Sequence, residues 1–176
     1  MYNISSKLLI KDIQVFHFLN GRIKSHVMRR LMLVITHLGG AFFSIALSLF
    51  WILMRPDFNP QIGWELGVVL LSSHIFVHII KRVINRRRPY VDLINIEQII
   101  EPFESYSFPS GHTTASFCIA FVVSFHLPSL LPFLLLTALS VAISRIYLGV
   151  HYPSDVLFGI IIAVIFSFAV HFSYFA

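Results

Sequence analysis

Charged side chains are scarce in this sequence of 176 residues, where Asp, Glu, Lys and Arg together make up 12% of the chain. A soluble domain carries about 25% of these residues. Hydrophobic residues account for 57% of the chain, and the mean hydropathy is +0.81. Since so few polar residues cannot cover the surface of a soluble domain of this length, we predict an integral membrane protein. The length fits one domain, residues 1–176.

Cysteine and the common metal-binding patterns are also rare or missing. Cys118 is the single cysteine, so no disulfide can form within the chain. The sequence has no C-x-x-C pair and no H-E-x-x-H motif, and it shows no repeat and no low-complexity tract. It also lacks a basic start followed by an uninterrupted apolar core and a cleavage site of small residues. A cleaved signal peptide is therefore not expected.

Long apolar runs are abundant, and a membrane helix needs about 20 mostly apolar residues. Five segments reach or approach this length, of which the third is short. They predict an all-α fold, a transmembrane bundle of about five spanning helices within residues 31–176. The five segments are Leu31–Met54, Trp64–Ile80, Thr113–Leu127, Leu130–Leu148 and Val156–Phe175.

The N-terminal segment, residues 1–30, has a different character. Within residues 8–20, apolar side chains recur at helical spacing, but Lys11 and Asp12 interrupt the run. The segment is too charged to span a bilayer and is typical of an amphipathic helix that lies at the membrane interface. The positions that recur at helical spacing are Leu9, Ile13, Phe16 and Leu19 or Asn20.

Five spans would place three polar clusters on the same membrane face. These clusters are KRVINRRRP (Lys81–Pro89), PSGH (Pro109–His112) and SRIYLGVHYPSD (Ser144–Asp155). Lys81 and Arg88 are seven residues apart, about two helical turns, so we expect both to point the same way before Pro89 ends the helix.

The residue types in these clusters suit a tetrahedral phosphate. Lys81, Arg88 and Arg145 can neutralise and hydrogen-bond phosphate oxygens. Ser110 is a suitable N-cap for the helix that starts near His112. Gly111 would let backbone N–H groups approach an anion at that helix N-terminus.

Two histidines allow a division of labour between attack on phosphorus and protonation of the leaving oxygen. Asp155 follows His151 by four residues. A carboxylate on one ring nitrogen fixes the tautomer and stabilises the charge that builds as the other nitrogen attacks. This favours His151 as the nucleophile and leaves His112 as the general acid.

The pattern Lys-x6-Arg-Pro, Pro-Ser-Gly-His and Ser-Arg-x5-His-x3-Asp resembles that of the type 2 phosphatidic acid phosphatase superfamily, the membrane lipid phosphate phosphatases. The sequence carries all three motifs in order between Lys81 and Asp155, without departure, and looks like a small bacterial member. The resemblance implies metal-independent hydrolysis through a phosphohistidine on His151, with no cofactor and no nucleic-acid partner. It implies that His112 protonates the leaving group and then activates water. The residues implied to hold the phosphoryl group are Lys81, Arg88, Ser110, Gly111, His112 and Arg145.

Several other polar residues have simpler interpretations. Arg82, Arg86 and Arg87 are interpreted as membrane anchors or headgroup contacts. His74 and His78 lie four residues apart, a metal-ligand spacing, but no third ligand is evident. His78 shares a helical face with Lys81 and could support the site.

The remaining polar residues singled out lie in loops or near span ends. His37 with Gly39-Gly40 is interpreted as a point of close helix packing. Asp57 and Glu65 fall on the membrane face opposite the three clusters. The favoured interpretation of the loop glutamates is solvation rather than gating of the basic pocket. They are Glu97, Glu101 and Glu104.

The sequence constrains the membrane face of the site and the identity of the substrate less strongly than it constrains the site residues. Lys and Arg are concentrated on the face of the three clusters, which by the positive-inside rule would be cytoplasmic. Relatives are understood to act on the outer leaflet, and we expect the same extracytoplasmic face in the cell membrane. Undecaprenyl diphosphate, phosphatidylglycerol phosphate and phosphatidic acid all fit, the first slightly preferred by analogy.

Two alternatives stay open. One is a non-enzymatic membrane protein that binds or transports anionic phospholipid. The other is a vanadate enzyme, because the soluble vanadate-dependent haloperoxidases share this pocket; such an enzyme would need added vanadate.

Overall fold

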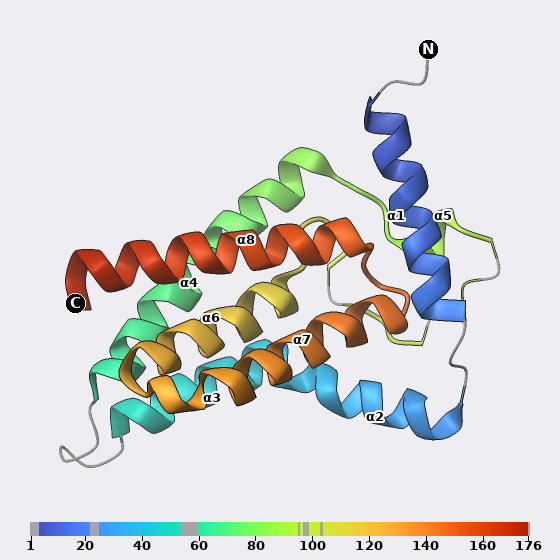
Figure 1. Ribbon diagram of the computed structural model, residues 1–176. Helices are drawn as coiled ribbons and strands as arrows, with labels where there is room; N and C mark the ends of the chain where they lie inside the picture. Colours follow the sequence, from blue (N-terminus) through green and yellow to red (C-terminus); the bar gives the residue numbers. More distant parts are fainter. Residues whose placement is uncertain are drawn as a thin grey trace.

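The computed structural model describes residues 4–21, 25–53, 60–94, 96, 99–102 and 104–175, and this part of the chain contains helices and no strand. Figure 1 shows a bundle whose long helices run along one direction, with α1 crossing one end. The helices are α1 (Ile4–Gly21), α2 (His26–Thr36), η1 (His37–Gly39), α3 (Ala41–Leu53), α4 (Gln61–Ile84), α5 (Pro89–Asp92), α6 (Gly111–His126), η2 (Pro128–Leu130), α7 (Leu131–Tyr147), α8 (Pro153–Val170) and η3 (His171–Phe175).

Helix α6 forms the centre of the bundle and contacts α3, α4, α7 and α8. Most of its residues are buried, and many are small or hydroxylated, so that neighbouring helices approach closely. A Cβ atom at Gly159 of α8, for example, would lie 2.8 Å from the Ser110 carbonyl oxygen at the start of α6. With 16 residues, α6 is about 24 Å long, and it is enclosed by helices that face the lipid.

The outer surface of the bundle is apolar, as a membrane environment requires. Phe42, Leu53, Trp64, Leu71 and Phe133 are each at least 60% exposed. Three helical stretches are long and apolar enough to cross a membrane, and a fourth is added if the bent pair of α2–η1 and α3 counts as one span. The predicted all-α bundle is confirmed, although α6, predicted as the short span Thr113–Leu127, does not reach spanning length.

The predicted first span, Leu31–Met54, is not one straight helix. It breaks between η1 and α3, where the two halves meet at an angle of 49°. Gly40 is extended there, with φ −77° and ψ 156°. A Cβ atom at Gly39 would lie 2.6 Å from the His112 carbonyl oxygen and 2.7 Å from Cγ1 of Val141. The predicted close packing at Gly39-Gly40 is therefore confirmed, and it brings this break against the start of α6.

Helix α1 lies against the ends of α7 and α8 (Figure 1). Its buried face consists of Asp12, Phe16 and Asn20, spaced four residues apart. The Asn20 amide donates to the Tyr147 carbonyl oxygen at 2.8 Å. The predicted helix is present, and Phe16 and Asn20 of the predicted face are buried, but Asp12, predicted to interrupt that face, is buried as well. Ile13 is half-buried, and the side chains of Leu9 and Leu19 lie outside the described residues.

We expect Gly39→Ala to lower the free energy of unfolding by about 1–3 kcal/mol, because the added methyl group overpacks the contact with His112 and Val141. Thermal unfolding of the protein in detergent measures this change. Gly67→Ala is the matched control, since the nearest atom to its new Cβ is Oγ of Ser48 at 3.3 Å. A Gly39→Ala protein as stable as the wild type would contradict the packing described here.

Candidate active site

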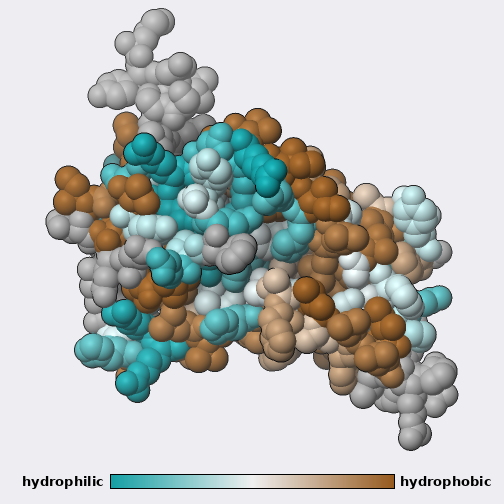
Figure 2. All heavy atoms as spheres, turned by 180° about the vertical axis from the view of Figure 1, so that it is seen from behind, coloured by the Kyte–Doolittle hydropathy of each residue, from teal (hydrophilic) through white to brown (hydrophobic). Residues whose placement is uncertain are grey.

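The three polar clusters of the sequence meet at one end of the bundle. Lys81 lies in the last turn of α4, Arg145 in the last turn of α7, and His112 and Asp155 in the first turns of α6 and α8. His151 lies in the short connection between α7 and α8. Figure 2 shows hydrophilic residues gathered mainly toward this end of the rear face, with hydrophobic residues over most of the remainder.

A cavity of about 880 Å³ opens at this end. Its lining includes most of the predicted site residues: Lys81, Arg88, Gly111, His112, Arg145 and His151. The other two, Ser110 and Asp155, are fully buried and do not line it. Residues from three separate sequence motifs are thus brought together as predicted.

Three cations of the cavity are almost completely buried: Lys81 is 4%, Arg88 2% and Arg145 3% exposed. Arg88 donates to the Val150 carbonyl oxygen at 2.9 Å, and Arg145 donates to Oγ1 of Thr36 at 2.6 Å. The Nε atom of Arg145 is buried and has no hydrogen-bond partner among the described residues. Because buried cations and unpaired donors are costly, this lining favours an anionic ligand.

Arg88 approaches the cavity from a different part of the chain than the sequence predicted. Helix α4 ends at Ile84, and Asn85 turns the chain with a left-handed φ of 51°. Arg88 is therefore not on the helix of Lys81, and Pro89 begins α5 rather than ending α4. The prediction that Lys81 and Arg88 share one helical face is wrong, although both side chains line the same cavity.

Glu104 partly fills the cavity on the side of Lys81. Its Oε2 lies 2.6 Å from Nζ of Lys81, and its Oε1 lies 3.2 Å from Nδ1 of His78. Its backbone carbonyl oxygen accepts from Nε and Nη2 of Arg88 at 3.1 and 2.8 Å. The favoured interpretation of Glu104 as simply solvated is wrong. Glu101 also lines the cavity, and Glu97 lies outside the described residues.

These contacts affect the charge of Glu104. Burial alone would raise the pKa of its carboxyl group, but the hydrogen bond and charge of Lys81, and then those of His78, outweigh it and lower the pKa. Glu104 therefore stays ionised into mildly acidic conditions and competes with any other anion for Lys81. His78 contributes to the site by holding Glu104, while His74 lines the same cavity and bonds the Leu70 carbonyl oxygen.

The start of α6 is open to the cavity as the sequence predicts. Ser110 caps the helix: its Oγ accepts from the Thr113 backbone N–H. A Cβ atom added to Gly111 would have no neighbour closer than 3.9 Å, the nearest being Nε2 of His74 and Cγ1 of Val77. The first N–H groups of α6 can thus approach an anion, and the helix dipole favours one there.

The His151 ring is held between a cation and a carboxylate. Its Nε2 lies 3.5 Å from Nη1 of Arg88, and its Nδ1 lies 3.5 Å from Oδ2 of Asp155. Nδ1 makes no hydrogen bond among the described residues, and the same carboxylate oxygen accepts from the Tyr152 N–H at 2.8 Å. Catalytic hydrogen bonds are often longer before substrate binds. The predicted pairing is therefore close but not formed.

Burial lowers the pKa of His151 well below the ordinary value, and the charges of Arg145, Arg88 and Lys81 lower it further. The ring is consequently neutral at neutral pH. A neutral imidazole has a free lone pair on one nitrogen, which is the form that a nucleophile requires.

Arg86 and Asp12 form a second layer that the sequence did not reveal. Arg86 donates to Oδ1 of Asp155 at 2.7 Å and to Oδ2 of Asp12 at 2.6 Å. Its guanidinium also lies 3.9 Å from the ring centroid of Tyr152. The chain is not helical between Asn85 and Arg88. Arg86 and Arg88 are directed into the protein, while the Arg87 side chain is 75% exposed. Interpreting Arg86 as a membrane anchor is wrong.

Comparison with known proteins matches this chain to a protein family and to several named relatives. The family model of the PAP2 superfamily matches residues 62–176. "Phosphatidylglycerophosphatase B" of Bacillus subtilis is 32% identical over 158 residues, which cover 81% of this chain and 73% of that protein. "Bacitracin transport permease protein BcrC" of Bacillus licheniformis is 30% identical over 156 residues, 88% of this chain and 76% of that protein.

A solved structure agrees with the fold. The crystal structure of a transmembrane PAP2-type phosphatidylglycerolphosphate phosphatase from Bacillus subtilis superimposes with a TM-score of 0.77 at 26% identity. It covers 93% of this chain and 84% of that one.

We expect Glu104→Gln to bind inorganic phosphate roughly tenfold more tightly than the wild type, which corresponds to about 1.4 kcal/mol. The substitution removes the anion that competes for Lys81 and keeps the backbone carbonyl that Arg88 uses. Titration calorimetry on the purified protein measures the affinity. Glu101→Gln, another glutamate lining the cavity, is the control, and an equal gain in both variants would argue against specific competition by Glu104.

Proposed function

The chain belongs to the PAP2 superfamily, and we propose that it is an integral-membrane lipid phosphatase of a single domain. The reaction is hydrolysis of a phosphomonoester or diphosphate on a lipid, without a metal. The observation that carries the proposal is the convergence of three buried cations and two histidines on one cavity. The relatives and the solved structure named as phosphatases support the reaction class.

The first step proposed is transfer of the phosphoryl group to His151. Nε2 of His151, next to Arg88, attacks phosphorus while the bond to the leaving oxygen breaks. Lys81, Arg88 and Arg145 carry the charge of the phosphoryl oxygens in the transition state. Burial and the charge of Arg145 lower the pKa of His112 to about 2 before substrate binds. The ring therefore takes up a proton from water when the phosphate dianion enters, and it then donates that proton to the leaving oxygen. Asp155 stabilises the positive charge that forms on the ring.

The second step regenerates the enzyme. His112, now without its proton, accepts one from a water molecule that attacks the phosphohistidine. The P–N bond breaks, inorganic phosphate is released, and His151 returns to its neutral form. The open N-terminus of α6, which Ser110 caps and Gly111 leaves uncovered, would hold phosphate oxygens through its backbone N–H groups in both steps.

Apolar residues beside the cations support a lipid as substrate. Leu71, Ile75 and Ile79 lie on one face of α4 and line the same cavity. They are 65%, 54% and 54% exposed. A headgroup can therefore enter the cavity while its hydrocarbon chains stay in the bilayer along this face. Undecaprenyl diphosphate, phosphatidylglycerol phosphate and phosphatidic acid all meet this requirement.

We place the site on the extracytoplasmic face of the cell membrane. By the positive-inside rule, the many Lys and Arg residues on this face favour a cytoplasmic location. Four of them are bound within the site and so are weaker indicators of topology: Lys81, Arg86, Arg88 and Arg145. Arg87, at 75% side-chain exposure, can be replaced by cysteine and treated with a membrane-impermeant maleimide. Labelling in intact cells supports an outward face, and labelling only after lysis contradicts it.

The reaction is tested by phosphate release from the three candidate lipids by the protein in detergent, with EDTA present. We expect turnover that EDTA does not stop, that vanadate inhibits, and that is lost in His151→Ala and in His112→Ala. A protein that binds these lipids without releasing phosphate would instead be an anionic-lipid binder or transporter. Activity that appeared only with added vanadate would indicate the vanadate enzyme.

Arg86 is a positioning residue in this account, acting through Asp155. We expect Arg86→Gln to lower kcat by about tenfold to a hundredfold with little change in KM, because a charge-assisted hydrogen bond is worth about 1.5–3 kcal/mol. Arg86→Lys should restore part of kcat, and Arg87→Gln should match the wild type. A loss confined to thermal stability, with kcat unchanged, would mean that Arg86 serves folding alone.

A further inference from the structure

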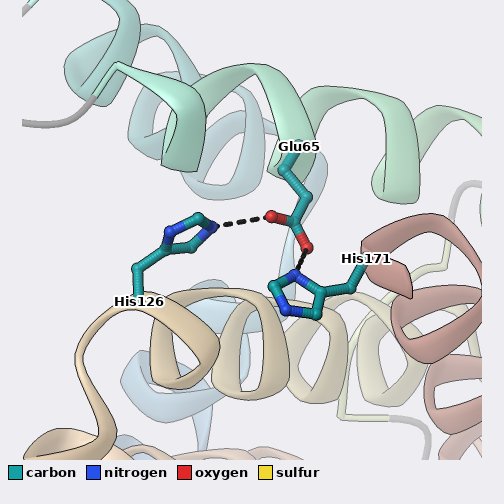
Figure 3. Close-up of side chains that lie close together, drawn as sticks. All are labelled: Glu65, His126 and His171. Atoms are coloured by element: carbon teal, nitrogen blue, oxygen red, sulfur yellow. Dashed lines mark hydrogen bonds and ion pairs between the residues drawn. The ribbon is translucent and has the colours of Figure 1, made fainter. Parts of the chain in front are cut away.

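A second polar cluster lies at the other end of the bundle and plays no part in the proposed reaction. Figure 3 shows Glu65 between His126 and His171, with both rings pointing at its carboxylate. Oε2 of Glu65 is 2.7 Å from Nε2 of His126, and Oε1 is 3.0 Å from Nδ1 of His171. The three residues come from α4, from the last position of α6 and from the turn η3 after α8.

The cluster is far from the active-site cavity. Helix α4 carries Glu65 near its start and Lys81 near its end, and the 16 residues between their positions correspond to about 24 Å. The same three helices therefore present the active-site motifs at one end and this cluster at the other. A phosphoryl group bound in the cavity therefore cannot touch it.

The cluster has the chemistry of a metal site. One ligand atom from each residue can be chosen so that all three lie within 4.8 Å of one another. Two imidazoles with one carboxylate are a common protein ligand set for Zn²⁺, which binds nitrogen and oxygen at about 2.0–2.2 Å and leaves a fourth position for water. Imidazole nitrogens also suit related divalent ions such as Co²⁺ and Ni²⁺.

The three side chains are largely buried, which distinguishes this cluster from a chance grouping of polar residues on the surface. The Glu65 side chain is fully buried, while the side chains of His126 and His171 are 9% and 14% exposed. A buried carboxylate is costly unless a positive partner balances it. The cation of a bound metal supplies that balance, and the small exposed edges of the two rings give an ion access from water.

The ring of His171 is also held in place by aromatic neighbours. Phe125 stacks on it, with the ring centroids 4.1 Å apart and an interplanar angle of 22°. Phe172 meets it edge-on at 5.2 Å. Such packing limits rotation of the imidazole, so that Nδ1 stays directed at Glu65. A pre-oriented ligand lowers the entropic cost of binding an ion.

We propose that Glu65, His126 and His171 form a Zn²⁺-binding site that joins the ends of α4, α6 and α8. Zn²⁺ would replace the contact between each ring nitrogen and the carboxylate. Each ring binds as neutral imidazole, with its proton on the nitrogen that does not face the ion. Nε2 of His126, Nδ1 of His171 and a Glu65 oxygen are the protein ligands, and water completes the shell. The role is structural, because the site joins three helices and lies outside the active-site cavity.

The proposal is tested by titrating Zn²⁺ into the full-length protein in detergent after EDTA treatment and dialysis. We expect one high-affinity equivalent per chain and a rise in Tm at saturation. In the double variant His126→Gln, His171→Gln we expect the affinity to fall by more than about a hundredfold, since loss of even outer-shell partners costs 10–100-fold. The visible absorption of bound Co²⁺ reports the same site.

The matched control is His78→Gln, which removes a histidine that contacts a different glutamate, Glu104, at the active-site end. It should retain the high-affinity equivalent. Wild-type protein that is folded by circular dichroism and releases phosphate but binds no Zn²⁺ would overturn the proposal and leave a hydrogen-bonded His–Glu–His cluster. Undiminished Zn²⁺ binding by the double variant, or loss of the site in His78→Gln, would also overturn it. Phosphatase activity is scored separately, so failure of the proposed reaction would not be mistaken for failure of this site.

Discussion

The burial of three like charges in one cavity is the constraint on which the rest of the structure depends. Lys81, Arg88 and Arg145 repel one another and lose their hydration, which is costly in a membrane protein. The chain offsets part of this cost with backbone carbonyl oxygens and one hydroxyl group, each supplied by a loop or helix end near the cavity. Glu104 supplies a carboxylate. A phosphate dianion would neutralise these three cations more completely than Glu104 does. We therefore interpret the cavity as a phosphate-binding site.

Charge pairing continues behind the cavity, in a second layer of residues. The carboxylate beside His151 belongs to Asp155, which Arg86 holds at 2.7 Å. Arg86 is in turn held by Asp12 of α1 at 2.6 Å. The N-terminal helix is thus connected through two ion pairs to the carboxylate nearest the proposed nucleophile. This explains why the buried face of α1 carries an aspartate where a purely lipid-binding helix would carry an apolar residue.

The sequence predicted which motif residues share the cavity, because the three polar clusters alternate with long apolar helices in a way that brings all three to one end of the bundle. It predicted the helical membrane fold from apolar run length alone. It did not predict the break at Gly39-Gly40 as a bend, since a hydropathy run does not record where a neighbouring helix approaches. Nor did it predict the side-chain partners of Arg86, Glu104 and Glu65, which lie 23 to 106 residues away along the chain. Side-chain pairs at such separations follow from the tertiary arrangement and leave no local pattern.

The central claim, that a phosphoryl group seated by these cations passes to His151, is tested most directly by trapping the intermediate. The purified protein is mixed with a lipid substrate, quenched in alkali on the timescale of one turnover, digested and analysed by mass spectrometry. The account predicts phosphate on the peptide that contains His151, absent in His151→Ala. Phosphate on another residue, or rapid turnover by His151→Ala, would contradict it.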